Sequence, residues 1–302
     1  MLGIGWARCP GTCGEWVQGA RAGVPFLVDS PIERFAEVFL ELDLDAPQWK
    51  IPLAKEKTRQ ALSLLRQEYG FKGGGHVRFL ESLPAGKGMA SSTADIVASA
   101  AAFLRALGLT PTPEMLANLA LTIEPSDSVM FPGITLLNHV QGGGSESLGP
   151  AVSAQFLALD WGGAVDTLAF NARQDLAGHY RRFEPEIALA LALVKEGIAK
   201  RDLEKLAAGS SMSARCNQAI NPKPCFETFA AWVQVNGGLG LITAHSGTLL
   251  AGIFPATENL DSLLSEVRER FSPNDSAILR ARDGGVDSGS WDQRGGKEHA
   301  WR

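Results

Sequence analysis

Apolar and polar side chains alternate in three segments of the first third of the chain. The alternation is clearest at residues 34–43, where it extends over most of RFAEVFLELD, and it recurs at 24–28 and 76–83. A period of two places one face of a strand in the core and the other face in solvent. We therefore expect three strands here.

Helical spacing of apolar residues appears between and after these strands. Residues 54–70 carry this spacing and end at a glycine, which commonly stops a helix. Residues 93–108, rich in Ala, Leu and Phe, have no internal glycine or proline and also end at a glycine. Residues 113–123 begin with a proline, which the first turn of a helix tolerates. The pattern predicts three helices, so the first half of the chain should be mixed.

The glycine and serine residues of QGGGSESLGP, 141–150, interrupt the periodic pattern. We expect them to separate an N-terminal lobe, 1–150, from a C-terminal lobe, 151–282. In the C-terminal lobe we expect strands at 154–161, 165–170, 239–243, 248–254 and 276–282. We expect helices there at 184–199, 202–219, 224–235 and 258–271. The polar, glycine-rich residues 283–302 are expected to form a mobile tail.

Composition restricts the class of protein and of partner. The chain has 302 residues, 45% of them apolar, which is enough for a sizeable core. No apolar run approaches the roughly 20 residues that cross a bilayer, and the N-terminus lacks the regions of a signal peptide. We expect a cytoplasmic protein without a membrane partner. A net charge of -5 gives no broad attraction for nucleic acid, so any phosphate binding should be local.

Four cysteines, at positions 9, 13, 216 and 225, form two loose pairs with the spacings C-x3-C and C-x8-C. Neither spacing matches a zinc site or a thioredoxin-type motif. The favoured interpretation is reduced thiols that pack as small apolar groups. A metal site or a reactive thiol is the alternative.

The strongest candidate for a binding site lies between the strand that ends at Leu83 and the helix at 93–108. The stretch PAGKGMASST, 84–93, combines two glycines and a lysine with three hydroxyl residues at the helix start, although its spacing is not that of a P-loop. The first N–H groups of a helix lack partners and lie at the positive end of its dipole, so they can bind an anion. The alternative is a serine N-cap on an ordinary helix.

This stretch resembles the second motif of the GHMP kinase superfamily, P-x-x-x-G-L-G-S-S-A, with Met89, Ala90 and Thr93 in place of Leu, Gly and Ala. PGTCGE, 10–15, resembles the first motif, P-G-x-x-x-G-E, shortened by one residue, and AHSGTLLAG, 244–252, resembles the third.

Within that superfamily, the motifs CPGTCGE, KGMASSTADI, IEPSDS and AHSG are most similar to those of the L-threonine kinase family of cobamide biosynthesis and propanediol utilisation. The four motifs occur in the right order and extend over about residues 9 to 252 of the chain.

The resemblance implies a two-lobed α+β fold, with an N-terminal lobe like domain 2 of ribosomal protein S5 and a ferredoxin-like C-terminal lobe. It also implies ATP and Mg²⁺ as cofactors, with Ser92 as a magnesium ligand. The residues implied to hold the triphosphate are Pro84, Gly86, Lys87, Gly88, Met89, Ala90, Ser91, Ser92 and Thr93.

Two acidic residues, Glu124 and Asp127, follow the expected helix at 113–123, and Pro125 turns the chain between them. Both could therefore point into one cleft. The resemblance implies that one acid accepts the proton of the acceptor hydroxyl and the other binds magnesium. We assign Asp127 to the acceptor and Glu124 to the metal, and the reverse assignment stays open. The alternative is a proline turn in which Asp127 caps the next segment.

An amino acid acceptor needs one group for its carboxylate, one for its ammonium and space for its hydroxyl. The candidates in the matched motifs are Cys13, Gly14, Glu15, His245, Ser246 and Gly247. Taken alone, His245 would be read as a core or surface histidine and Glu15 as a solvated charge.

The hypothesis is an ATP-dependent kinase that converts L-threonine to L-threonine O-3-phosphate, which supplies the aminopropanol linker of cobamides. One alternative is a homoserine kinase or another small-metabolite kinase of the superfamily. An alternative of another class is a catalytically inactive nucleotide-binding regulator, against which the retained Ser92, Glu124 and Asp127 argue. The sequence gives no oligomeric state.

Overall fold

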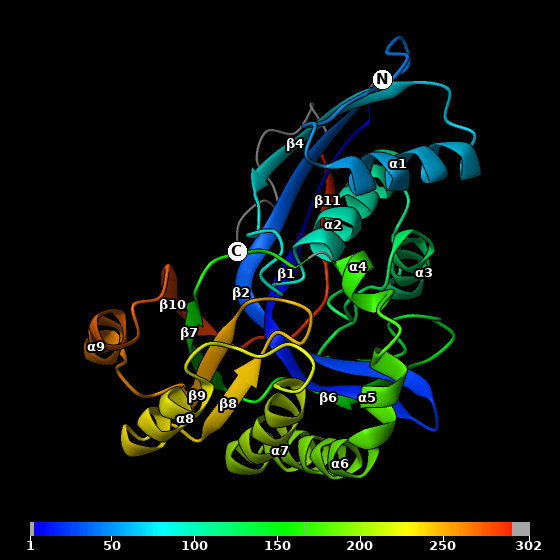
Figure 1. Ribbon diagram of the computed structural model, residues 1–302. Coiled ribbons are helices and arrows are strands. Elements are labelled where there is room, and N and C mark those ends of the chain that lie inside the picture. Colours follow the sequence, from blue (N-terminus) through cyan, green and yellow to red (C-terminus); the bar gives the residue numbers. More distant parts are fainter. Residues whose placement is uncertain (1–2, 166, 292–302) are drawn as a thin grey trace.

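The computed structural model describes residues 3–165 and 167–291. One sheet of eleven strands runs through this part of the chain, in the order β10-β7-β9-β8-β1-β2-β4-β3, with β11 paired to β1 and β5 paired to β2 and β6 (Figure 1). The strands are β1 (Ile4–Arg21), β2 (Val24–Asp43), β3 (Trp49–Lys50), β4 (Gly74–Glu81), β5 (Ile134–Leu137), β6 (Ser145–Gly149), β7 (Ala154–Asp160), β8 (Gly240–Thr243), β9 (Leu250–Pro255), β10 (Asp275–Arg280) and β11 (Asp287–Trp291).

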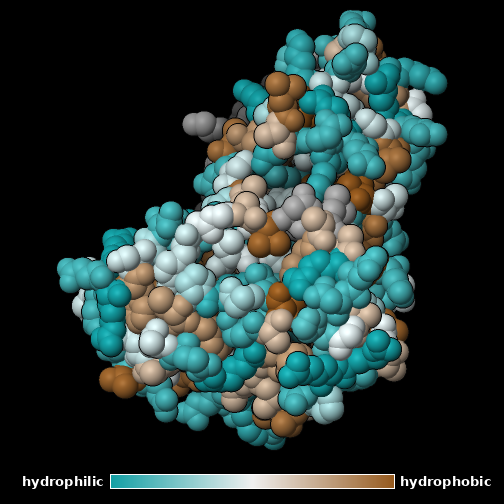
Figure 2. All heavy atoms as spheres, in the orientation of Figure 1, coloured by the Kyte–Doolittle hydropathy of each residue, from teal (hydrophilic) through white to brown (hydrophobic). Residues whose placement is uncertain are grey.

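Helices cover the sheet in two groups. The helices are α1 (Glu56–Glu68), α2 (Ser91–Ala106), α3 (Pro113–Ile123), α4 (Thr167–Asn171), α5 (Leu176–Arg182), α6 (Glu184–Lys200), α7 (Leu203–Asn217), α8 (Phe226–Val235) and α9 (Asp261–Phe271). Figure 1 shows α1, α2 and α3 beside the upper half of the sheet and α6 to α9 around its lower half. Figure 2 shows the corresponding narrow upper lobe and broader lower lobe. No helix in the described residues is long and apolar enough to span a membrane.

The hairpin of β1 and β2 runs the length of the molecule and belongs to both halves. Its turn is Ala22 and Gly23, both at positive φ, which is the geometry of a tight hairpin turn. The two strands expected at 24–28 and 34–43 are parts of the single strand β2. The pairing of β1 with β2 shifts register near Gly11, Thr12 and Glu15, so this part of the ladder is bulged.

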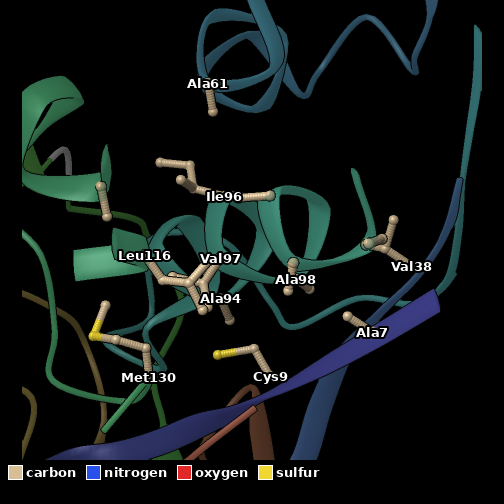
Figure 3. Close-up of a cluster of buried hydrophobic side chains, with 14 of the residues drawn as sticks. Ala7, Cys9, Val38, Ala61, Ala94, Ile96, Val97, Ala98, Leu116 and Met130 are labelled. Carbon is tan, nitrogen blue, oxygen red and sulfur yellow. The ribbon is translucent and has the colours of Figure 1, made fainter. Parts of the chain in front are cut away.

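Helix α2 is the centre of the upper core. Its side chains are buried on nearly every face, because it lies between the hairpin and helices α1 and α3. In Figure 3, Ala94 and Ala98 point toward Cys9 and Ala7 of β1, while Ile96 points toward α1. Small side chains on both elements permit this close approach, which explains why the segment is rich in alanine.

Three expectations from the sequence were wrong in part. Residues 165–170, expected as a strand, belong largely to helix α4; a short apolar run does not distinguish the two structures. Residues 145–149, inside the expected glycine-serine break, form β6. Residues 287–291 of the expected mobile tail form β11, because the edge of β1 offers unpaired backbone groups. The rest of that tail, 292–302, lies outside the described residues.

The contact between β1 and α2 predicts a stability difference between two Gly→Ala variants. A Cβ at Gly5 would lie 1.9 Å from the backbone oxygen of Ala102, so Gly5→Ala must displace α2. We expect it to lower the free energy of unfolding in urea by about 1–3 kcal/mol.

The matched control is Gly178→Ala in helix α5, where no atom lies within 4 Å of the added Cβ. It should leave the free energy of unfolding unchanged or raise it by up to about 1 kcal/mol. Equal stability of the two variants would show that α2 tolerates a shift away from β1.

Candidate active site

A cavity of about 390 Å³ opens at the N-terminus of α2. Strand β1, the first turn of α1, the turn before α2 and the segment after α3 contribute to its wall. Expected site residues that line it are Glu15, Gly86, Gly88, Met89, Ala90, Ser91, Ser92, Thr93, Glu124, Asp127 and Ser246. Expected site residues outside its lining are Pro84, Lys87, Cys13, Gly14, His245 and Gly247.

The turn before α2 has a backbone conformation that suits an anion. Gly86, Gly88 and Ala90 all have positive φ, at 71°, 80° and 57°. A Cβ at Gly88 would lie 2.1 Å from that of Ala244, so this turn packs directly against the start of the AHSG motif. Glycine at 88 is therefore required by both conformation and space.

Helix α2 does not begin with a serine cap. The helix starts at Ser91, and its N-cap residue is Ala90, whose side chain makes no capping hydrogen bond. The ordinary interpretation of the stretch, a serine N-cap, is therefore wrong. The first-turn residues Ser91, Ser92 and Thr93 line the cavity, at the positive end of the helix dipole and without a side-chain cap on its amides.

Glu124 reaches the first turn of α2 from the end of α3. The Ser92 hydroxyl donates a hydrogen bond to its Oε1, and Lys57 Nζ lies 2.5 Å from its Oε2. The Glu124 side chain is buried although both partners line the cavity. The expected pairing of Ser92 with Glu124 is thus present as a direct contact.

A hydroxyl and a carboxylate that meet at the wall of a cavity are oxygen donors of the kind that Mg²⁺ prefers. Ser92 and Glu124 fit a shared magnesium ion for this reason. Lys57, which the sequence reasoning did not single out, holds the second carboxylate oxygen of Glu124. Lys55 also lines the cavity and pairs with Asp95 at 2.5 Å.

Asp127 lies beside the same helix turn but has different partners. The Thr93 hydroxyl donates to Asp127 Oδ2 at 2.9 Å, and the Asp127 backbone N–H donates to Thr93 Oγ1 at 3.2 Å. Burial raises the pKa of Asp127 to about 7, and the nearby carboxylates of Glu15 and Glu124 add to this effect. A carboxyl group with a pKa near neutrality can exchange a proton with a ligand at physiological pH.

Glu15 is held from behind by His245. Glu15 Oε2 accepts hydrogen bonds from the His245 backbone N–H at 2.8 Å and from its Nδ1 at 2.9 Å. Ser213 Oγ lies 2.9 Å from His245 Nε2 and accepts the backbone N–H of Gln18. Because a carboxylate can only accept, the Nδ1 that faces Glu15 carries a proton. His245, expected in contact with the acceptor, instead fixes the carboxylate that lines the cavity.

Asp29 is a residue that the sequence reasoning missed. It is fully buried in β2, and its Oδ2 accepts hydrogen bonds from the backbone N–H and the hydroxyl of Ser128, the latter at 2.7 Å. Burial and the nearby Asp127 raise its pKa well above the usual value. The available signal was a carboxylate inside the largely apolar segment PFLVDSPI.

The AHSG turn is held by a second group of buried side chains. Lys223 Nζ donates to the Gly247 carbonyl at 2.7 Å, and Asn221 donates to the carbonyls of His245 and Gly247. Burial lowers the pKa of Lys223 to about 7. These contacts explain why Gly247 supports the site without lining the cavity.

Lys87 is directed away from the cavity. Its Nζ lies 2.5 Å from Asp160 Oδ2, at the end of β7, and donates to the Gly163 carbonyl at 2.8 Å. It therefore ties the turn before α2 to the lower half of the sheet. In the described structure, the lysines that line the cavity are Lys55 and Lys57.

The cysteines are free thiols, and Cys9, Cys13 and Cys216 are buried. Burial raises the pKa of Cys13, which packs in the core below Glu15 and does not line the cavity. This agrees with the interpretation of small apolar packing groups. The neighbouring Gly14 is at positive φ and lies against the Thr243 backbone.

Comparison with known proteins relates the chain to the GHMP kinases. The family described as GHMP kinases N terminal domain matches residues 56–131. The L-threonine kinase of Salmonella typhimurium is 30% identical over 248 residues, which is 81% of each chain. The L-threonine kinase of Citrobacter freundii is 27% identical over 296 residues, 93% of this chain and 98% of that protein.

Solved structures show the same fold. Mevalonate diphosphate decarboxylase from Enterococcus faecalis superposes with a TM-score of 0.70 at 17% identity, over 97% of this chain and all of that one. Homoserine kinase from Cytophaga hutchinsonii superposes with a TM-score of 0.67 at 15% identity, over 95% of this chain and 97% of that one. The expected two-lobed α+β architecture is confirmed. With a relative of 30% identity over four fifths of both chains, the protein belongs to the GHMP kinase family, as a relative of the L-threonine kinases.

Proposed function

We propose that the protein transfers the γ-phosphoryl group of ATP to the side-chain hydroxyl of L-threonine, which gives L-threonine O-3-phosphate and ADP. In the cell the product would supply the aminopropanol linker of cobamides, in the cytoplasm. The two L-threonine kinases to which most of the chain is similar support this acceptor.

The observation that carries the proposal is the meeting of Ser92, Glu124 and Asp127 at one helix N-terminus within one cavity. Phosphoryl transfer depends mostly on positioning and on neutralising spread negative charge. The uncapped amides of α2 and the ammonium groups of Lys55 and Lys57 supply positive charge at this end of the cavity. Asp127 adds a carboxylate next to this positive charge.

In the proposed site, the turn 84–93 holds the triphosphate, and Ser92 and Glu124 hold Mg²⁺. The bound ion would neutralise charge that develops on the β- and γ-phosphates. The contacts favour Glu124 as the metal ligand over Asp127, because Glu124 is the acid that touches Ser92.

Asp127 is the proposed base. The threonine hydroxyl oxygen forms a bond to the γ-phosphorus while the bond from that phosphorus to the ADP oxygen breaks. The hydroxyl proton passes to the Asp127 carboxylate, and ADP leaves with the electron pair of the broken bond. Thr93 orients Asp127 through the paired hydrogen bonds described above.

A second candidate acceptor is L-homoserine, because a homoserine kinase shares the fold. We expect ADP release with L-threonine to exceed that with L-homoserine or L-serine, measured as kcat/KM at saturating ATP. A preference for L-homoserine would show that L-homoserine, and not L-threonine, is the acceptor. Tight ATP binding without turnover of any alcohol in a broad panel would favour the nucleotide-binding regulator.

The proposed metal site predicts the behaviour of two conservative variants. Ser92→Ala and Glu124→Gln should each lower kcat by about 10- to 100-fold and raise the Mg²⁺ concentration needed for half-maximal rate. The control is Ser99→Ala, on the buried part of the same helix, which should keep the wild-type magnesium dependence. An unchanged magnesium dependence in Ser92→Ala would remove Ser92 from the metal site.

The raised pKa of Asp127 predicts a pH dependence of defined sign. The base must be ionised, so kcat/KM should be constant above pH 7 and fall about tenfold per pH unit below it. Asp127→Asn should lower kcat by about 10²- to 10⁴-fold and abolish this acid limb.

Burial also brings the pKa of Lys223, which holds the AHSG turn, to about 7. If protonated Lys223 were required, the rate would fall above pH 7, in the opposite direction. An acid limb that persists in Asp127→Asn would assign the proton acceptor to another residue.

A further inference from the structure

Three carboxylates form a cluster beside the cavity: Glu15 and Asp127 line it, and the fully buried Asp29 lies outside its lining. Oxygen atoms of Glu15, Asp29 and Asp127 all lie within 4.8 Å of one another. Among the described residues, no lysine or arginine forms an ion pair with any of the three; Glu15 contacts the imidazole of His245 instead. Buried carboxylates at this separation repel one another unless a cation or protons compensate their charge.

Buried polar atoms without a hydrogen-bond partner occur both in this cluster and on the wall of the cavity. Asp29 Oδ1 is buried without a hydrogen bond, and so are both ring nitrogens of His139, which lines the cavity. Buried polar atoms without a partner cost free energy, so such atoms indicate a missing ligand. Burial lowers the pKa of His139 to about 4, so its ring is neutral and does not supply the missing positive charge.

We propose that Glu15 and Asp29 bind the protonated amine of the acceptor, beside the hydroxyl at Asp127, and thereby select an amino acid over a simple hydroxy acid. This inference rests on the proposed function and extends it to the recognition of the substrate. Glu15 and Asp29 act as specificity residues, and His139 offers one donor and one acceptor to the same ligand.

The covalent structure of the acceptor agrees with this placement. In L-threonine the amine and the hydroxyl are on adjacent carbons, so their nitrogen and oxygen are at most about 4 Å apart. A hydroxyl placed at Asp127 therefore brings the amine within reach of carboxylate oxygens that lie up to 4.8 Å from Asp127.

The hydrogen bonds already present favour an ammonium group over a second divalent cation. Glu15 Oε2 is used by His245, Asp29 Oδ2 by Ser128 and Asp127 Oδ2 by Thr93. One oxygen of each acid therefore remains for a ligand. The free oxygens of Glu15 and Asp29 suit two N–H groups of an ammonium and that of Asp127 suits the hydroxyl, whereas Mg²⁺ requires about six ligands in an octahedron.

Direct binding tests this proposal without turnover. Calorimetry on the full chain, loaded with a non-hydrolysable ATP analogue and Mg²⁺, compares L-threonine with 1-amino-2-propanol, which lacks the carboxylate, and with 3-hydroxybutanoate, which lacks the amine. We expect the two amines to bind and 3-hydroxybutanoate to bind at least about 10-fold more weakly than 1-amino-2-propanol.

Asp29→Asn and Glu15→Gln should each weaken binding of both amines by about 10- to 100-fold, with the affinity for the ATP analogue unchanged. The same chemical change at an exposed acid of α9, Asp261→Asn, is the matched control. It should alter neither the binding of the amines nor the affinity for the ATP analogue. Equal losses for 3-hydroxybutanoate and the amines would overturn the proposal. If neither variant folds, the ligand series on the natural chain still decides it.

Two results separate this inference from its alternatives. Stoichiometric binding of Mn²⁺ without nucleotide, lost in Asp29→Asn, would make the cluster a metal site and overturn the proposal. Discrimination in favour of amines, together with phosphorylation of L-homoserine but not L-threonine, would refute the proposed acceptor and still support the role of the cluster.

Discussion

The geometry of the site depends on how closely α2 packs against the hairpin of β1 and β2. The body of the helix is buried on nearly every side, so its N-terminus cannot move independently of the sheet. The turn before it is also tied to β1, since the Thr12 backbone N–H donates to the Met89 carbonyl at 3.2 Å and the Thr12 hydroxyl donates to the Gly88 carbonyl. Glu15 is on the same strand. The amides of α2 and the carboxylate of Glu15 are thereby fixed relative to each other by the core.

That core places opposite charge preferences in one cavity. The N-terminus of α2 and two lysines favour an anion, while the carboxylates of Glu15, Asp29 and Asp127 favour a cation. A nucleotide and a zwitterionic acceptor satisfy both preferences when the acceptor's amine is directed away from the phosphates. Electrostatics alone then orients the acceptor before any shape complementarity is considered.

The sequence predicted those parts of the fold whose signal is local. Helices α1 and α2 were recognised from spacing and glycine stops, and α3 from its first-turn proline. The second motif identified the turn at α2. Strand β1 was not recognised, because CPGTCG combines residues that usually interrupt strands, and only its pairing with β2, β8 and β11 makes it one. The same cause explains β11, whose polar residues have no strand pattern of their own.

Site residues also divide into those with a local sequence signal and those that only the folded chain reveals. Ser92, Glu124 and Asp127 were found because they occur in motifs, and the structure brings them together. Asp29 and His139 belong to none of the matched motifs, and their importance appears only when the chain folds. The partner of Lys87 could not be foreseen for the same reason, since Asp160 comes from a strand in the other half of the molecule.

The bond between Glu15 and His245 joins residues that are 230 positions apart in the chain. During synthesis on the ribosome, Glu15 is therefore made early and stays without its partner until nearly the whole protein has been translated. A nascent chain can assemble α2 against the hairpin long before this bond forms. The turn before α2 also waits for this late segment, because Gly88 packs against Ala244, so both sides of the cavity are completed only late in translation.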